Sequence, residues 1–377
     1  MKKFGFGCMR LPMLAGEVGG SGVVDLEQVS KMVDLFLDNG FTYFDTAHGY
    51  ISGSSETAMR ECLVKRHPRD SFTLTDKLTG NYWQKQEDIR PLFEKQLEAC
   101  GVTYFDYYLM HALTNELYDR YKSSHAFEEV LALKKEGKIR HMGISFHDKA
   151  YVLDRILKEQ PEIEYVQIQY NYRDITDSGV ESDKVYDVCV KYNKPVIVME
   201  PCKGGALADR LPDQAKGILN ALHGGSPASY AIRFAASQPQ VFMVLSGMST
   251  LEQAQDNISY MKDFKPLDDT ERKAVGEVVD ILHGMNTIAC TACHYCTDGC
   301  PKKIRIPDLF SCYNAKQMYK DWNSSLYYSV SSEKAGAGKA SDCIRCGQCA
   351  RVCPQHLPIP DLLQKVAEEF EKGDKKA

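Results

Sequence analysis

The sequence has 377 residues, of which 44% are hydrophobic and 26% are charged, so its composition is that of an ordinary globular protein and excludes a disordered chain. The formal net charge of -5 offers no basic surface of the kind that nucleic-acid binding requires, and we expect no nucleic-acid partner. No run of eighteen apolar residues occurs and the N-terminus has no apolar signal region, so we expect a cytoplasmic protein with no membrane partner.

Short apolar runs alternate with longer amphipathic stretches from the start of the chain to about residue 250. Eight runs are predicted as strands, namely residues 4–8, 42–46, 72–76, 107–111, 141–145, 165–169, 196–201 and 241–246. Helical patterns lie between them, including residues 26–39, 86–100, 127–136 and 180–192. Eight strands that alternate with helices favour a parallel sheet closed into a (β/α)8 TIM barrel. An open doubly wound sheet is the alternative, but no Gly-x-Gly-x-x-Gly turn follows the first strand.

The composition changes near residue 285, after a further helix predicted over residues 268–283. Nine of the fourteen cysteines lie between Cys290 and Cys353, whereas the other five are scattered over the preceding part of the chain. A secreted disulfide scaffold would be short and evenly bridged, which this chain is not. We therefore predict two domains, residues 1–284 and residues 285–377.

The second domain contains the motif Cys-x2-Cys-x2-Cys-x3-Cys-Pro twice, beginning at Cys290 and at Cys343. In such a motif three cysteines bind one iron–sulfur cluster and the fourth binds the other. This rule assigns one [4Fe–4S] cluster to Cys290, Cys293, Cys296 and Cys353, and a second to Cys343, Cys346, Cys349 and Cys300. Zinc sites or disulfides are the alternatives, but zinc sites use two close pairs that lie far apart. Residues 288–360 resemble the bacterial two-cluster ferredoxins, which implies a small ferredoxin-like domain.

Polar residues at the ends of the predicted barrel strands form the candidate active site. Asp45, Lys77 and His111 are about one βα unit apart, so they end consecutive strands and converge at the mouth of the barrel. Tyr50 follows on the first of these loops. A buried lysine beside a tyrosine is expected to lower the phenol pKa, while Asp45 keeps the lysine charged. The set suits proton delivery to an oxygen whose carbon receives hydride.

The barrel resembles the aldo-keto reductases over about residues 4–265, through Phe44-Asp45-Thr46-Ala47 with Tyr50, Thr75-Asp76-Lys77, Tyr108-Leu109-Met110-His111 and Gly143-Ile144-Ser145. The resemblance implies that Tyr50 is the general acid, that Lys77 and Asp45 tune it, and that His111 orients a carbonyl. It also implies a nicotinamide cofactor, NAD(H) or NADP(H), and a small carbonyl or alcohol substrate.

The same resemblance implies two groups of cofactor-binding residues. Ser145 and Gln167 would bind the nicotinamide carboxamide, and the segment that opens the next helix would bind the adenosine end through Gly247, Gln253 and Asn257. Gly247 and Gln253 stand where the family often has a lysine and an arginine. We therefore expect NADH to be used at least as well as NADPH, unless Lys203 or Lys262 supplies a cation.

These observations predict a nicotinamide-dependent oxidoreductase that interconverts a carbonyl and an alcohol, with two clusters that exchange electrons with a ferredoxin or flavoprotein. Hydride carries two electrons and each cluster carries one, yet the sequence has no flavin motif. The clusters could instead be structural or sensory. A third possibility is an electron-transfer or redox-sensing protein whose barrel mainly binds cofactor and partner, but the complete Asp45, Tyr50, Lys77 and His111 set argues against it.

Overall fold

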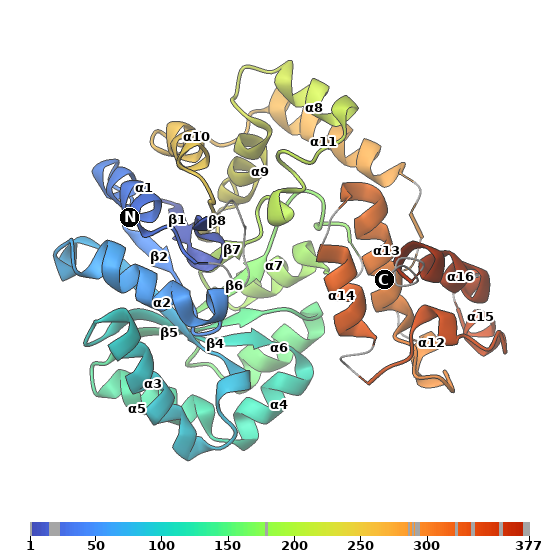
Figure 1. The fold of residues 1–377 in the computed structure, drawn as a ribbon, viewed down its shortest axis with the longest axis horizontal. Helices are drawn as coiled ribbons and strands as arrows, with labels where there is room; N and C mark the ends of the chain where they lie inside the picture. Colours follow the sequence, from blue (N-terminus) through green and yellow to red (C-terminus); the bar gives the residue numbers. More distant parts are fainter. Residues whose placement is uncertain are drawn as a thin grey trace. The chain divides into compact units, whose positions relative to one another are not determined.

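Eight parallel strands form a closed barrel in sequence order, which confirms the predicted (β/α)8 architecture (Figure 1). The computed structural model describes residues 2–14, 23–177, 180–285, 287–288, 290, 295–320, 323–332, 336–353 and 357–371. The strands are β1 (Phe4–Gly7), β2 (Tyr43–Asp45), β3 (Thr73–Leu78), β4 (Phe105–Leu113), β5 (Ile139–Phe146), β6 (Tyr165–Gln169), β7 (Val196–Met199) and β8 (Val241–Gly247). Strand β4 extends beyond the predicted run at both ends, because residues 105, 106, 112 and 113 also join the sheet.

Helices follow the strands and account for most of the remaining described chain. In the first three-quarters of the chain they are α1 (Leu26–Asp38), α2 (Ser54–Met59), α3 (Gln86–Cys100), α4 (Asn115–Ser123), α5 (Ala126–Lys135), α6 (Ala150–Glu159), α7 (Ser182–Lys191), α8 (Asp213–Asn220), α9 (Pro227–Ala236), α10 (Leu251–Met261) and α11 (Asp269–His283). The later helices are α12 (Tyr295–Asp298), α13 (Ile306–Tyr319), α14 (Asn323–Ser331), α15 (Gln348–Arg351) and α16 (Ile359–Phe370).

The chain divides into two compact units. The first comprises Met1–Ile175, Val180–Ala208 and Leu222–Arg272, and the second comprises Thr176–Gly179, Asp209–Ala221 and Lys273–Ala377. The first unit contains the barrel and the second contains both cysteine motifs. The domain boundary at residue 284 stays a prediction, since this division assigns residues 273–284 to the second unit.

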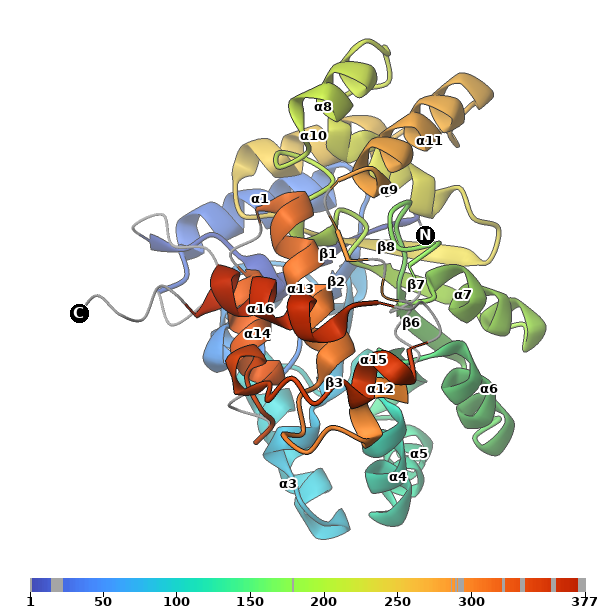
Figure 2. The ribbon, with the colours of Figure 1, turned by 90° about the vertical axis from the view of Figure 1, so that its right-hand side faces the viewer.

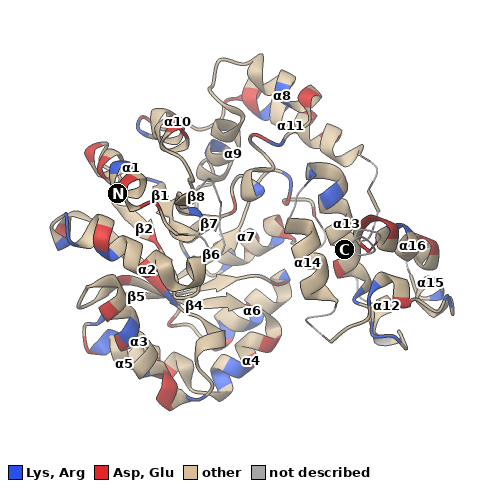
Figure 3. Ribbon diagram, in the orientation of Figure 1, with Lys and Arg blue, Asp and Glu red and all other residues tan. Residues whose placement is uncertain are grey.

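Apolar side chains on the outer face of the sheet pack against the helices. Phe36 of α1 illustrates this layer, since its ring centroid lies 5.5 Å from that of Phe6 and 5.0 Å from that of Phe41. Helix α1 begins where the Asp25 side chain accepts the N–H of Gln28. These contacts fix each helix to its strand and thereby fix the loops at the mouth of the barrel. Figure 3 shows acidic and basic residues interspersed on outer helices such as α3 and α4.

A separate buried cluster fills the inside of the barrel, as expected when strands of a TIM barrel alternate their side chains between core and helices. It consists of Tyr43, Leu109, Tyr165, Ile197, Met243 and Leu245. Gly143 of β5 lies beside Tyr165 in the neighbouring strand, and a Cβ atom at this position would lie 2.5 Å from the tyrosine ring. The glycine is therefore required by the close approach of a large ring.

The second unit has its own apolar core, contributed largely by helices α13 and α16 (Figure 2). Leu309 and Phe310 of α13 and Leu363 of α16 are fully buried there, and Tyr328 stacks on Phe370 with ring centroids 4.6 Å apart. Six of the motif cysteines border this core, either within it or packed against it, namely Cys290, Cys296, Cys300, Cys343, Cys349 and Cys353. Within the described ranges, no helix is both long enough and apolar enough to cross a membrane.

Candidate active site

The ends of strands β2 and β3 hold an ion pair at the mouth of the barrel. Lys77 Nζ donates to Asp45 Oδ1 at 2.6 Å and to the Thr46 carbonyl at 2.6 Å. The Lys77 side chain is fully buried, which makes an ammonium costly unless it is paired. Burial lowers the pKa of Lys77, but the neighbouring Asp45 and Tyr50 outweigh that effect and raise it. Lys77 therefore carries a fixed positive charge.

Tyr50 lies directly against this charge. The Lys77 ammonium is 4.6 Å from the centre of the Tyr50 ring, at the start of a short 3₁₀ turn over Tyr50–Gly53. Ile51 and Ser52 in this turn have φ angles of 51° and 53°, a left-handed conformation that is unfavourable for a β-branched residue. Such strain persists only where the surrounding structure imposes it, and here it accompanies the placement of Tyr50.

His111 of β4 completes the group that the sequence predicted to converge. Its ring centroid lies 5.9 Å from that of Tyr50 at an interplanar angle of 76°. Burial, together with the charge of Lys77, lowers the pKa of His111 well below its ordinary value, so the imidazole is neutral. Its Nδ1 lies 2.7 Å from the Thr79 hydroxyl. If that hydroxyl donates, the ring proton is on Nε2, where it can be donated to a ligand.

One electrostatic expectation from the sequence is confirmed only in part. We expected Lys77 to lower the phenol pKa of Tyr50, but burial raises that pKa and the lysine charge only opposes the rise. The reason is that burial destabilises a phenolate by more free energy than one neighbouring cation contributes in stabilising it, since the same cation is already paired with Asp45. Tyr50 is therefore a neutral phenol that can donate a proton.

Ser145 and Gln167 lie on the next two strands. The Ser145 hydroxyl accepts the N–H of Ala112 at 2.7 Å, which fixes the backbone just after His111. The Gln167 side chain is buried, and its Oε1 has no hydrogen-bond partner among the described residues. An unpaired buried amide oxygen is unfavourable, so Gln167 fits a ligand that offers an N–H group, such as a carboxamide.

The segment at the end of β8 holds the other predicted cofactor residues. Gln253 is already engaged, because its Oε1 accepts the N–H of Ser249 at 2.8 Å. Asn257 is buried and is bonded to Ser246 and to Tyr260, so both ends of its amide are occupied. Gly247 is exposed, and a Cβ atom there would lie 3.2 to 3.4 Å from the side chain of Arg10.

Arg10 is a residue that the sequence analysis missed. It follows strand β1, whose last residue pairs with Gly247, and its carbonyl accepts the Ser249 hydroxyl at 3.0 Å. The half-buried guanidinium makes no hydrogen bond or ion pair with any residue that the structure describes. The sequence does contain a signal for Arg10, because it is a cation three residues beyond strand β1. The loop after every barrel strand opens on the face that carries the active site. Lys203, by contrast, is paired with Asp174 at 2.7 Å.

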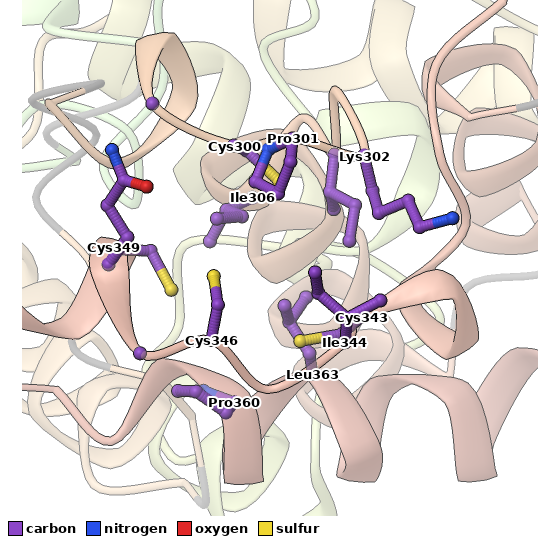
Figure 4. Close-up of a pocket in the computed structure, with 14 residues that line it drawn as sticks. Cys300, Pro301, Lys302, Ile306, Cys343, Ile344, Cys346, Cys349, Pro360 and Leu363 are labelled. Atoms are coloured by element: carbon purple, nitrogen blue, oxygen red, sulfur yellow. The ribbon is translucent and has the colours of Figure 1, made fainter.

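In the second unit, four motif cysteines line one cavity (Figure 4). Three of them, Cys343, Cys346 and Cys349, belong to one motif, and Cys300 is the fourth cysteine of the other. The sulfur atoms of Cys346 and Cys349 point into the cavity. Four thiols from two motifs around one apolar-lined cavity form the donor set that a [4Fe–4S] cluster requires.

The other predicted ligand set is described in part. Cys296 is buried in the core of the second unit, and Cys290 and Cys353 pack against that core. Cys293 lies outside the described residues.

Comparison with known proteins identifies both parts of the chain. Residues 3–280 match the aldo/keto reductase family. The chain belongs to the aldo/keto reductase family. It is therefore an oxidoreductase enzyme, and its barrel is the fold of that family. Residues 289–358 match the 4Fe-4S dicluster domain, so this aldo/keto reductase carries a two-cluster iron–sulfur domain after the barrel.

Individual relatives are distant and match the barrel. An uncharacterized oxidoreductase, YqkF of Bacillus subtilis, is 24% identical over 68% of this chain and 86% of its own length. L-galactose dehydrogenase of Arabidopsis thaliana is 23% identical over 66% of this chain and 82% of its own. The crystal structure of an aldo-keto reductase from Klebsiella pneumoniae with NADPH has a TM-score of 0.59, is 21% identical and covers 74% of this chain and 90% of that one.

Proposed function

We propose that this aldo/keto reductase uses a nicotinamide cofactor to interconvert a carbonyl and an alcohol, with Tyr50 as the proton donor. The observation that carries the proposal is the Lys77 ammonium, held by Asp45 and the Thr46 carbonyl and directed against the Tyr50 ring. A bound nicotinamide would supply hydride. The chain's own residues would supply the proton that the carbonyl oxygen takes up.

The residues divide this task between them. Tyr50, a neutral phenol, donates its proton to the oxygen, and the fixed charge of Lys77 stabilises the phenolate that remains. A neutral His111 donates a hydrogen bond to the same oxygen and so orients the carbonyl. Because the pKa of Tyr50 is raised, the donor is protonated at neutral pH, which favours the direction of carbonyl reduction.

The buried, unpaired Gln167 Oε1 supports a carboxamide at the centre of the barrel, beside Ser145, whose hydroxyl proton is still available. We further propose that Arg10 neutralises a 2′-phosphate near Gly247. The relative crystallised with NADPH makes that ligand a reasonable one for this barrel. Arg10 thus reverses our expectation from the sequence, and we now expect NADPH to bind at least as tightly as NADH.

For the second unit we propose that the two clusters transfer electrons to or from a ferredoxin or flavoprotein partner. Cys346 is exposed, so one edge of the cavity it lines with Cys300, Cys343 and Cys349 lies near solvent. A cluster there would supply one-electron transfer within reach of a partner. The exposure is the specific observation that favours this role over a purely structural one.

The proposal is tested by replacing Tyr50 with Phe, which removes the hydroxyl and keeps the ring. Reduction of carbonyl compounds with NADPH and NADH, assayed anaerobically, should slow by on the order of 10²–10⁴-fold, the usual range for a positioned acid. Cofactor affinity should change little. Tyr82→Phe is the matched control, because it removes a hydroxyl from an exposed ring on a neighbouring loop. Normal turnover of the Tyr50→Phe variant would exclude Tyr50 as the proton donor.

A further inference from the structure

A second group of titratable side chains lies behind the candidate active site, between strand β3 and helices α2 and α3. Glu56 of α2 and Asp76 of β3 are both buried, with exposed fractions of 1% and 0%. One carboxyl oxygen of each and the Cys100 sulfur all lie within 4.8 Å of one another. Two carboxylates this close in a site that excludes water would repel each other strongly.

The hydrogen bonds around the pair leave one acceptor without a donor. Glu56 Oε2 lies 2.9 Å from Nδ1 of His48, and Asp76 Oδ1 accepts the N–H of Lys77 at 2.7 Å. The Cys100 thiol donates to Asp76 Oδ2. Glu56 Oε1 is buried and has no partner among the described residues. A proton held between the two carboxyl groups would satisfy this oxygen and remove one of the two charges.

Among the residues that the structure describes, no cation takes the place of such a proton. The Lys77 ammonium is bound to Asp45 and to the Thr46 carbonyl. The other titratable groups whose charges act on this site are His48, Cys100, Tyr108 and Cys8. The Tyr108 hydroxyl donates to Gln96, and burial raises the pKa values of Cys100 and Cys8, so both thiols are neutral.

We propose that Glu56 and Asp76 share one proton, and that this shared proton holds the loop of Tyr50 against the strand of Lys77. Glu56 bonds to His48, two residues before Tyr50, and Asp76 directly precedes Lys77. Loss of the proton to solvent leaves two carboxylates, which push α2 and His48 away from β3. Glu56 and Asp76 are thus positioning residues. The consequence for turnover rests on the proposed function, whereas the shared proton does not.

The electrostatics of the pair agree with this geometry. Burial raises the pKa of Glu56 to about 7, and burial together with the charge of Glu56 raises the pKa of Asp76 well above its ordinary value. An acid whose pKa is raised by folding stabilises the fold fully below its ordinary value, here 4.5 for Glu56. That stabilisation is lost as the pH rises toward and through the raised value. We therefore expect the barrel to lose stability between about pH 5 and pH 7, as Glu56 loses its own proton. Asp76, whose pKa is raised well above its ordinary value, keeps the shared proton on the pair to alkaline pH.

The test compares the full-length protein with Glu56→Gln, in which an amide can bond to both Asp76 and His48 without titrating. The wild type should show the infrared carbonyl band of a buried protonated carboxyl at pH 8, and Glu56→Gln should shift or lose it. The variant should also release about one proton fewer on unfolding near pH 6, because one titrating group is gone. Glu61→Gln, a partly exposed glutamate five residues further along, is the matched control and should change neither measurement.

Turnover provides the separate test of the positioning role. The rate constant for carbonyl reduction should fall at alkaline pH in the wild type, and Glu56→Gln should retain activity and move this fall to higher pH. Asp76→Asn should act in the same way, and it replaces Glu56→Gln in this test if Glu56→Gln does not fold.

Two results would contradict the proposal that the pair shares a proton: absence of the infrared band, or one equivalent of a bound non-iron metal that Glu56→Gln loses. An unchanged pH profile with the band present would overturn only the positioning role. Lack of any reductase activity would contradict the proposed function and leave the infrared and unfolding tests intact.

Discussion

At the scale of single residues, charge placement decides what the barrel mouth can do. Lys77 is held as a cation by Asp45, but burial raises the pKa of Tyr50 by more than the lysine charge lowers it. The residue types alone indicated the set, but the sign of the Tyr50 shift depends on how far the ring is removed from water. That quantity exists only in the folded chain.

Arg10 gives a prediction at this scale. Replacing it with Gln should weaken NADP⁺ binding about 10- to 100-fold and leave NAD⁺ within about threefold, because a charge-assisted phosphate contact contributes about 1.5–3 kcal/mol. Equilibrium dissociation constants for both nucleotides measure the effect without any turnover.

The matched control for Arg10→Gln is Lys158→Gln, which removes the same charge from an exposed position in the last turn of α6. Equal weakening by both variants would point to general attraction of the nucleotide rather than to a contact by Arg10. Unchanged NADP⁺ affinity in Arg10→Gln would exclude Arg10 from the site.

At the scale of elements, close packing inside the barrel sets the register of the strands. Gly143 of β5 and Tyr165 of β6 are neighbours in the sheet, and the tyrosine ring occupies the space above the glycine. Ser145 lies two residues beyond Gly143 on the same face of the strand, so this contact also fixes the height of Ser145 at the mouth.

Gly143→Ala should therefore destabilise the barrel. The added Cβ would lie 2.5 Å from the ring of a fully packed tyrosine, and overpacking of this kind costs about 1–3 kcal/mol. Thermal unfolding followed by circular dichroism would measure the loss. Gly276→Ala in α11 is the control, since nothing lies within 4 Å of its added methyl group and alanine favours a helix by about 1 kcal/mol. A wild-type melting temperature for Gly143→Ala would mean that Tyr165 can move aside.

At the scale of the whole molecule, the chain joins an aldo/keto reductase barrel to a two-cluster iron–sulfur domain. The barrel has its own core and its own candidate proton-delivery set, and the two-cluster domain has a separate core lined by cysteines. In the proposed function, hydride transfer in the barrel moves two electrons at a time and each cluster moves one. Removing one cluster while leaving the barrel intact tests whether electron transfer by the clusters is coupled to reduction in the barrel.

Cys346→Ser should remove one thiolate ligand and reduce the iron content of anaerobically purified protein from about eight to about four per chain. Carbonyl reduction with NAD(P)H should survive within several-fold, because the barrel residues supply the proton. Reduction driven by a one-electron donor such as reduced ferredoxin should disappear. Metal analysis and the two assays together make the measurement.

The control for Cys346→Ser is Cys62→Ser, which changes a thiol between helices of the barrel and should leave the iron content at its wild-type value. Loss of both activities in Cys346→Ser would show that the cluster serves the chemistry or the fold of the barrel. Survival of both activities would show that the cluster is not needed for turnover.

The sequence by itself determined the elements whose signals are local. Strand and helix periodicity predicted all eight strands, and the spacing of the cysteines predicted a two-cluster domain, because a metal-binding loop is set by neighbouring residues. The convergence of Asp45, Tyr50, Lys77 and His111 also followed, since strands of one barrel end on one face.

Tertiary structure alone decided which side chains were already engaged. Gln253 and Lys203 had appeared available for a cofactor, yet each is bonded within the barrel, whereas Arg10 stands beside Gly247 across 237 positions of sequence. The Glu56–Asp76 pair likewise depends on a helix packing on a strand. Hydrogen bonds and desolvation depend on which residues are close together in space, and the order of residues in the sequence does not show which these are.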